Sequence, residues 1–399
     1  MNTKKKRKKI GFIILAILLT AIAAVAAVAV YTVSFHKPDN GNEEPVFSTD
    51  GLVKETKEPS QSDNGETADE TEPEETQPPE EEKDEMFNFL ILGRDRVALN
   101  TDVIMLMNYN VTTKKLTIMQ IPRDTYVLIN NIGFKLNGVY GHYHNEGVSK
   151  KEKDPEDYGI RQLKSILEQN LCVKIHYYAM VNLNGFRKIV DILGGVEVDV
   201  PANMYYVDKD QGLYINLKKG KQTLNGEKAE MFIRYRSGWV QADIGRMDAQ
   251  KIFMSALLKK VKSSMNATTV VKLTNEVFKN VKTDVDLSDM VYFGKNLLDF
   301  DMENMTFMSA PGYSPTPPAG GGWYYVINRQ GMLDNINKHF NIYDFEITDS
   351  IFDTNKIFSG NKYAKYLTPY YNADPSTVIG GNEQSAEDIE QGGIHIPKV

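Results

Sequence analysis

The stretch MFNFLIL, residues 86–92, is an almost unbroken run of large apolar side chains, and Gly93 ends it in a charged loop. Two further apolar runs follow at residues 103–109 and 116–121, and the polar turn NVTTKK between them predicts a β-hairpin. Strands that are apolar along their whole length are typical of a sheet covered on both faces. This part of the chain therefore predicts a buried sheet.

Helical and extended patterns alternate after this sheet. Ile160, Leu163, Ile166 and Leu167 recur at three- and four-residue spacing, which predicts a helix over residues 157–170. The other predicted elements are helices at residues 184–193, 225–232 and 243–262 and strands at residues 177–181 and 196–200. Strands and helices in this order predict one α/β/α domain with a central mixed sheet, over residues 86–373.

The N-terminus predicts a membrane anchor. Six basic residues at positions 4–9 precede an uncharged apolar run at residues 10–35, which exceeds the roughly 20 residues that a spanning helix needs. The basic cluster predicts a cytoplasmic tail at residues 1–9 and an extracellular folded domain on a single-pass anchor in the cell membrane. The small residues AAVAAVAVYTV leave a cleaved signal peptide as the alternative. Because the basic cluster abuts the apolar run, we expect no nucleic-acid partner.

Two segments lack the apolar surface that a fold requires. Residues 39–85 carry 18 acidic side chains and three lysines, whereas the whole chain has a net charge of −7. Residues 36–85 are therefore predicted to be a disordered acidic extracellular stalk, and the folded domain is close to neutral. Residues 374–399 are predicted to be a disordered tail. The Gly/Pro-rich loop at residues 311–325 reads as a connection after which Trp323 and Tyr324 rejoin the core.

Cysteine and histidine offer little chemistry. Cys172 is the only cysteine, so no intramolecular disulfide can form, and we expect a small buried apolar side chain. His142 and His144 lie two residues apart in a predicted loop, without a third ligand at a recognisable spacing. We therefore do not expect this pair to bind a metal.

The chain contains no Walker loop, no G-x-S-x-G elbow and no Cys/His pair at catalytic spacing. Arginine and aspartate residues instead cluster where strands and helices end. Asp243, Arg246 and Gln250 lie at offsets that share one helical face. Guanidinium groups bind phosphate oxygens in pairs, and Mg²⁺ takes carboxylate and phosphate oxygens. The set predicts a pyrophosphate site, although each arginine alone is more simply explained by a surface salt bridge.

Seven ordered blocks make the pattern specific, and with them the chain resembles the LytR-CpsA-Psr family. The blocks are ILGRDR, TDVIML, IPRDTYV, KLNGVY, IVDILGGVEVDVP, LKKGKQTLNGEKAEMFIRYR and DIGRMDAQ. The resemblance implies a Mg²⁺-dependent phosphotransferase of the Gram-positive cell envelope, in which Mn²⁺ could replace Mg²⁺. Its donor would be a polyprenyl-pyrophosphate-linked glycan, such as wall teichoic acid or capsule, and its acceptor would be peptidoglycan.

The resemblance also assigns roles to residues. Asp95 and Asp102 match the metal-binding acids. The substrate-binding positions are Arg96, Lys135 and Asn137. The positions expected to act in catalysis are Arg123, Arg234, Arg236, Asp243, Arg246 and Gln250.

This sequence departs from the family pattern in the loop between Asp95 and Asp102, which is shorter than usual, and at Asn100, where an arginine is common. Two alternative functions use the same residues. One is a pyrophosphatase in which water is the acceptor, and the other is a noncatalytic receptor or regulator that senses lipid-linked glycans. Paired metal-binding acids favour catalysis.

Overall fold

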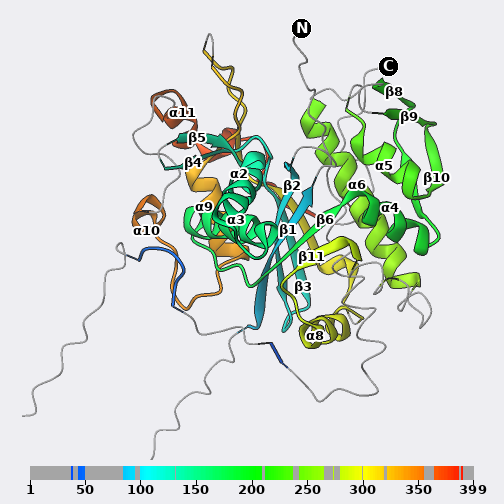
Figure 1. Ribbon diagram of the computed structural model, residues 1–399, viewed down its shortest axis with the longest axis horizontal. Helices are drawn as coiled ribbons and strands as arrows, with labels where there is room; N and C mark the ends of the chain where they lie inside the picture. The colour runs from blue at the N-terminus through cyan, green and yellow to red at the C-terminus, as the bar shows by residue number, and fades with distance from the viewer. Residues whose placement is uncertain are drawn as a thin grey trace, which may run out of the picture.

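The computed structural model describes residues 37–38, 44–49, 84–94, 99–130, 132–208, 212–236, 242–264, 273, 279–298, 300–318, 321–354, 364–385 and 388–389. Its centre is a seven-stranded sheet in the order β11-β6-β1-β2-β3-β12-β15 (Figure 1). The strands of this sheet are β1 (Met86–Arg94), β2 (Thr101–Asn110), β3 (Lys115–Gln120), β6 (Tyr177–Asn182), β11 (Val281–Thr283), β12 (Met305–Ser309) and β15 (Gln384–Ser385). β1 pairs antiparallel with β2 and parallel with β6, so the predicted mixed sheet is confirmed.

Apolar residues on both faces of each central strand explain why the sheet is buried. Phe89 and Ile91 of β1 belong to one apolar cluster, and Leu90 and Leu92 belong to the other. Successive side chains of a strand point to opposite faces, so a continuous apolar run supplies two cores. The hairpin predicted from NVTTKK is β2 and β3, which pair from Met105 with Gln120 to Asn110 with Lys115.

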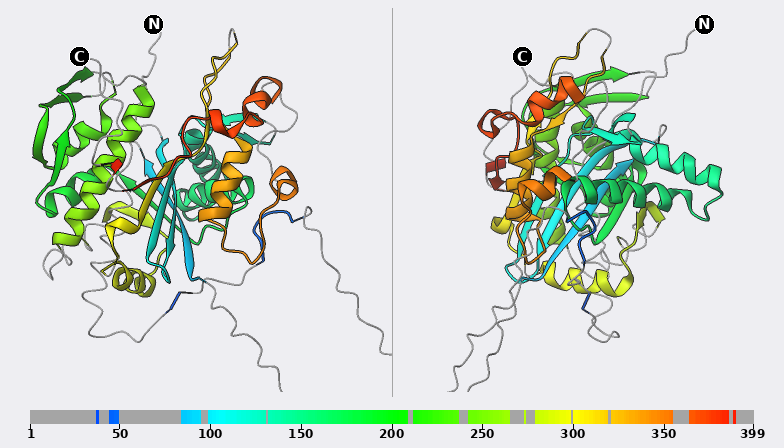
Figure 2. Two further views of the ribbon diagram at one scale, coloured as in Figure 1. Left: turned by 180° about the vertical axis from the view of Figure 1, so that it is seen from behind. Right: turned by 90° about the vertical axis from the view of Figure 1, so that its left-hand side faces the viewer.

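Helices cover both faces of the sheet, which confirms the layered α/β arrangement (Figure 2). The first face packs against α2 (Leu136–Lys150), α3 (Pro155–Leu171), α9 (Arg329–His339), α10 (Asp349–Thr354) and α11 (Ala364–Tyr371). The second face packs against α4 (Leu183–Ile192), α5 (Gly226–Arg234), α6 (Ala242–Ser264) and α8 (Leu287–Leu298).

Local signals set the ends of two helices. Asn225 caps α5 by accepting a hydrogen bond from the backbone N–H of Lys228 at 2.9 Å. Gly194 and Gly195 end α4 with φ values of 77° and 86°, a region that glycine enters without a steric penalty.

Small sheets lie outside the central one. The predicted strand at residues 196–200 is β7 (Val196–Val200), which pairs with β10 (Gly220–Leu224) rather than joining the central sheet. The other pairs are β8 (Met204–Asp208) with β9 (Leu213–Leu217), β4 (Tyr126–Ile129) with β5 (Ile132–Lys135), and β13 (Gly312–Tyr313) with β14 (Val326–Ile327).

The predicted loop around His142 and His144 is wrong, because both residues lie within α2. The glycines of this segment do not favour a helix, so the sequence did not predict one, but they allow close packing. A Cβ atom at Gly141 would lie 2.6 Å from the carbonyl oxygen of Leu99. Cys172 is buried as predicted, and burial raises the pKa of its thiol to about 12, so the side chain stays protonated.

The Gly/Pro-rich loop forms an arm, and Trp323 on this arm is 59% exposed. The prediction that Trp323 rejoins the core is therefore wrong, whereas the nearby Tyr325 is buried. Near the C-terminus, residues from 374 onward were expected to lack structure. They instead contain the 3-10 helix η3 (Pro375–Thr377) and the strand β15, which pairs with β12 at the sheet edge. The backbone groups of an edge strand favour such pairing even where side chains show no pattern.

The N-terminal segments fall mostly outside the described residues. The predicted spanning helix at residues 10–35 lies wholly outside them, and among the described helices none has the length and apolarity to cross a membrane. Part of the predicted stalk is described, and Phe47 is buried there with its ring 5.4 Å from that of Tyr343. A short piece of the predicted stalk therefore packs on the folded domain.

Candidate active site

A buried ion pair marks the end of the central sheet. Asp102 lies at the start of β2, and Arg123 lies in the loop that follows β3. The guanidinium Nη1 of Arg123 donates to Oδ1 of Asp102 at 2.7 Å, with side chains that are 11% and 0% exposed. Such a pair persists only with good geometry, because both charges have lost their water. Asp102, at the start of β2, therefore holds Arg123 in a fixed position.

Asp124 extends this pair toward α2. Its carboxylate accepts a charged hydrogen bond from Nζ of Lys135 at 3.1 Å and lies 3.8 Å from Nη2 of Arg123. The backbone N–H of Asn137 donates to the carbonyl oxygen of Arg123 at 3.0 Å, so the start of α2 fixes the loop. Lys135 and Asn137, which the resemblance assigns to substrate binding, thus lie close to Arg123 and Asp124.

Two further arginines approach from the second face. Arg246 of α6 is buried, and burial together with the nearby charge of Arg123 lowers the pKa of its guanidinium. Burial and the charge of Arg246 likewise lower the pKa of Arg236, which follows α5. Like charges that lose their water repel strongly unless an anion joins them. We call Arg123, Arg236 and Arg246 the arginine cluster.

The charge balance of this region favours an anion. With Lys135, the arginine cluster places four cations around two carboxylates, Asp102 and Asp124, within the described part of the chain. Guanidinium groups offer paired donors that match phosphate oxygens. A pyrophosphate would offset both the burial and the mutual repulsion that lower the pKa values of Arg236 and Arg246.

Gln250 supports the cluster from one turn further along α6. Its side chain is buried, accepts a hydrogen bond from Nε2 of Gln120 at 3.4 Å and donates to the carbonyl oxygen of Ile233 at 3.3 Å. It thereby links α6 to the end of β3 and to α5. These hydrogen bonds fix α6, which also carries Arg246, against β3 and α5.

Arg234 has a different described contact. Its Nη1 donates to Oε1 of Glu230 at 2.6 Å, and Glu230 also pairs with Arg187. Both Arg234 and Glu230 are buried in α5. Glu230 was not singled out from the sequence, although its four-residue spacing from Arg234 is the signal that would have found it. Asp124 belongs to the predicted group of charged residues at strand ends, in the IPRDTYV block, but it was given no role from the sequence.

Three predicted site residues are not described in the structure. Asp95 and Arg96 lie outside the described residues, immediately after Arg94 at the end of β1. Asp243 belongs to α6, but its side chain also lies outside the description. Their roles remain predictions.

The donor chemistry fits a hard cation only in part. Asp102 offers a carboxylate, and among the described residues no three His, Cys, Asp or Glu side chains gather as a possible metal site. The second predicted ligand, Asp95, lies outside the described residues. Carboxylate and phosphate oxygens are the ligands that Mg²⁺ accepts, so Asp95, Asp102 and a bound pyrophosphate are chemically suited to it.

The fold and the side chains at this end of the sheet define an α/β protein with an arginine-rich site. Residues 51–341 match the LytR_cpsA_psr family, and the chain belongs to it. The chain is 31% identical over 251 residues to the polyisoprenyl-teichoic acid–peptidoglycan teichoic acid transferase TagU of Oceanobacillus iheyensis, covering 62% of this chain and 72% of that protein. It is 26% identical over 240 residues to the enzyme TagV of Bacillus subtilis, covering 58% of each chain.

Solved structures support the fold. The crystal structure of Bacillus subtilis TagV aligns with a TM-score of 0.50 at 24% identity, over 63% of this chain and 94% of that one. A protein of Enterococcus faecalis described as a transcriptional regulator aligns with a TM-score of 0.53 at 22% identity, over 68% and 92% of the two chains. At these identities the likeness concerns the fold alone.

Proposed function

We propose that this protein is a phosphotransferase that attaches a glycopolymer from a polyprenyl-pyrophosphate carrier to peptidoglycan. The observation that carries the proposal is the arginine cluster, in which, besides burial, the charge of Arg123 lowers the pKa of Arg246 and the charge of Arg246 lowers the pKa of Arg236. The similar proteins TagU and TagV are named as transferases of polyisoprenyl-linked teichoic acid to peptidoglycan. Teichoic acid is therefore the first glycopolymer to test as donor.

The residues divide the work as follows. The arginine cluster binds the pyrophosphate oxygens and stabilises the negative charge that grows as an acceptor hydroxyl attacks the sugar-linked phosphorus. The bond from that phosphorus to the bridging oxygen breaks, and the lipid phosphate leaves. Asp102 holds Arg123 in place, while Gln250 ties α6, the helix that carries Arg246, to β3 and α5. Asp243 is our candidate for aligning the acceptor hydroxyl or accepting its proton.

Magnesium belongs to the same proposal. Asp95 and Asp102 would hold it, and bound Mg²⁺ supplies further neutralisation of the phosphate charge. The predicted anchor at residues 10–35 would keep the domain at the outer face of the cell membrane, where a lipid-linked donor is available.

Chelation tests the metal. Excess EDTA should abolish transfer by the wild-type protein, and added Mg²⁺ should restore it, with Mn²⁺ as a partial substitute. Asp102→Asn should raise the Mg²⁺ concentration needed for half-maximal stabilisation by a pyrophosphate ligand in thermal melts. Asp124→Asn serves as the matched control, because it neutralises a neighbouring, equally ion-paired carboxylate that is not assigned to the metal. Full turnover in excess EDTA would refute the metal assignment.

A product assay tests the function itself. Full-length protein in detergent, given a polyprenyl-pyrophosphate glycan and peptidoglycan fragments, should form a phosphodiester-linked glycan detectable by mass spectrometry. Well-aligned reactants gain an advantage of roughly 7 to 11 kcal/mol, so a positioned acceptor outcompetes water. Release of glycan phosphate at every acceptor concentration would support a pyrophosphatase instead. Donor binding without any product would support a receptor.

A further inference from the structure

The described residues near the N-terminus are attached to the folded domain at two places. Lys37 lies beside the start of β1, where its Nζ is 3.0 Å from Oε2 of Glu85. Phe47 is buried, and its ring meets the ring of Tyr343 edge-on, with the two centroids 5.4 Å apart. We call Lys37 and residues 44–49 the clasp. These residues lie on the domain surface instead of leaving it.

The surface that receives Phe47 is aromatic and lies after α9. Tyr343 stacks on Phe345 with ring centroids 5.2 Å apart, and both pack against the apolar cluster on the first face of the sheet. Val46 of the clasp packs against the same cluster. Burial of a large apolar side chain and edge-to-face contact between rings both favour this docking. Phe47 therefore holds the clasp on the domain.

Both attachments belong to the end of the sheet where β1 begins. Glu85, the partner of Lys37, directly precedes β1. The carbonyl oxygen of Phe340, shortly before Tyr343, accepts a hydrogen bond from Nδ2 of Asn88 near the start of β1 at 2.7 Å. In Figure 1 the short blue piece at residues 37–38 lies at the lower end of the sheet, whereas β4 and β5 lie toward the upper end.

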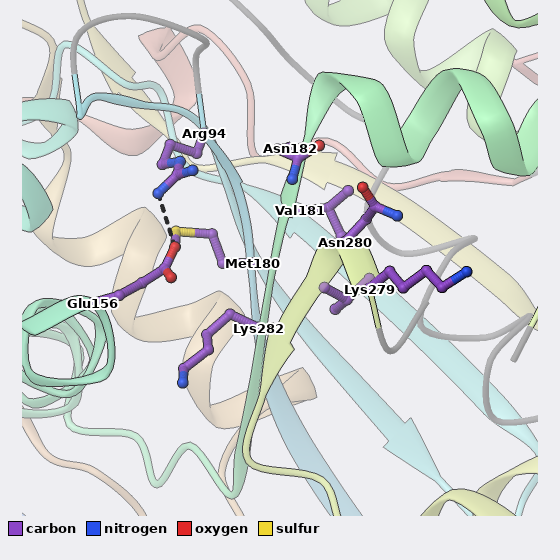
Figure 3. A pocket seen from close by; sticks show the side chains of 9 residues that line it. Arg94, Glu156, Met180, Val181, Asn182, Lys279, Asn280 and Lys282 are labelled. Carbon is purple, nitrogen blue, oxygen red and sulfur yellow. Dashed lines mark hydrogen bonds and ion pairs between the residues drawn. The ribbon is translucent and has the colours of Figure 1, made fainter. Parts of the chain in front are cut away.

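The arginine cluster lies at the opposite end of β1. Arg94 is the last residue of β1, and Figure 3 shows it pointing toward Glu156 of α3, to which it donates at 2.8 Å. Arg94 pairs in register with Thr101 of β2. Asp102 follows Thr101 and binds Arg123. A strand rises about 3.3 Å per residue, so the nine residues of β1 put the two ends of the sheet about 30 Å apart.

We infer that the clasp fixes the domain on its predicted membrane anchor with the arginine cluster facing away from the membrane. The predicted anchor ends at residue 35, so the attachment at Lys37 follows it almost directly. The acidic run at residues 50–83 then has both ends fixed on the domain and is not a free stalk. The inference rests on the anchor proposed above and is independent of the transferase chemistry.

The clasp changes what the domain can reach. A free segment of about 50 residues has an end-to-end distance of about 40 Å, which would let the domain turn in any direction above the membrane. The clasp instead holds the arginine cluster at a height of about 30 Å, the length of β1. A lipid-linked donor must then be lifted out of the headgroup layer to reach the cluster.

Two dye positions test this orientation in full-length protein reconstituted in vesicles of phosphatidylglycerol and phosphatidylethanolamine. Cys172 is buried and its thiol stays protonated, so a single introduced cysteine takes the dye. Lys115→Cys labels an exposed position at the end where β1 begins. Ile132→Cys labels an exposed position on β5, the strand that ends at Lys135. Energy transfer to an acceptor dye on the headgroups should place position 132 about 30 Å higher than position 115.

Two substitutions test the clasp itself. Phe47→Asp should abolish the difference in height, because the clasp opens and the domain turns freely. Tyr343→Ala removes the partner ring from the domain side and should have the same effect. Because the two substitutions act on different segments, a folding defect in one leaves the other as the test. Phe47→Leu is the matched control, since it keeps an apolar side chain at the same position and should preserve the difference.

Each outcome decides one part of the inference. Equal heights without the clasp substitutions, or position 132 nearer the membrane, would overturn the orientation. An unchanged difference in both Phe47→Asp and Tyr343→Ala would overturn the clasp. Protein that does not float with the vesicles would contradict the anchor and the inference with it. No reading requires turnover, so a failure of the transferase function would leave the inference intact.

Discussion

Arg246→Ala should reduce glycan transfer by about 10²- to 10³-fold, the loss typical when one preorganised charge donor is removed from an active site. The melting temperature should stay within a few degrees of the wild type. Arg246 is buried near the charge of Arg123, so the substitution removes a desolvated charge and its repulsion with Arg123, which favours folding. It also removes packing contacts of the side chain, which disfavours folding. Those two effects oppose one another.

Two controls make this result specific. Lys259→Ala removes an exposed cation from the same helix and should leave the rate unchanged. Arg246→Lys should recover only part of the activity, because an ammonium group cannot present a planar pair of donors. A variant that melts far below the wild type but transfers normally once folded would make Arg246 a structural residue.

Asp102→Ala should lower the free energy of unfolding by about 3–5 kcal/mol, as measured by chemical denaturation. The substitution leaves the guanidinium of Arg123 buried without the carboxylate that it contacts at 2.7 Å. Transfer should be lost as well, because Arg123 would no longer be held at the sheet edge.

The double variant Asp102→Ala with Arg123→Ala distinguishes two contributions to the loss of stability, the unpaired buried charge of Arg123 and the lost ion-pair contact. Removing both partners of a buried pair is far less costly than removing one, so the double variant should be more stable than Asp102→Ala alone. If the two single effects simply add, the ion pair makes no special contribution and Arg123 is not held as we describe.

The central fold could be predicted from the sequence because its signals are local. The apolar run of β1 and the β2–β3 hairpin reflect strands whose side chains face two cores. The helical spacing in α3 reflects a helix with one buried face. The helix α2 could not be predicted in this way. Its glycines carry no apolar pattern, and its stability comes from packing against α3 and the segment at Leu99.

Partners distant in sequence explain the other differences. The sequence of β7 predicts a strand, but it does not predict which strand it pairs with. Its partner is β10 and not a strand of the central sheet. β15 is only two residues long and depends on the open edge of β12. Trp323 looks like a core residue by type, yet the arm that carries it projects from the body (Figure 1).

The candidate site was partly predictable, because residues at strand ends meet at one edge of a sheet. Arg123 and Asp102 illustrate this, and Arg246 joins them from a helix motif far along the chain. The sequence could not show that Arg234 pairs with Glu230 inside α5, nor that Asp124 bridges toward Lys135. Those contacts depend on rotamers and on the packing of α2 and α5.

The central claim is that the arginine cluster binds pyrophosphate, and a comparison of lipid affinities tests it most directly. Full-length protein in detergent should bind a polyprenyl-pyrophosphate glycan at least about tenfold tighter than the corresponding polyprenyl alcohol, a difference that a single charge-assisted contact can supply. Arg246→Ala should remove most of that preference. Equal affinity of the wild type for the pyrophosphate and the alcohol would contradict the claim.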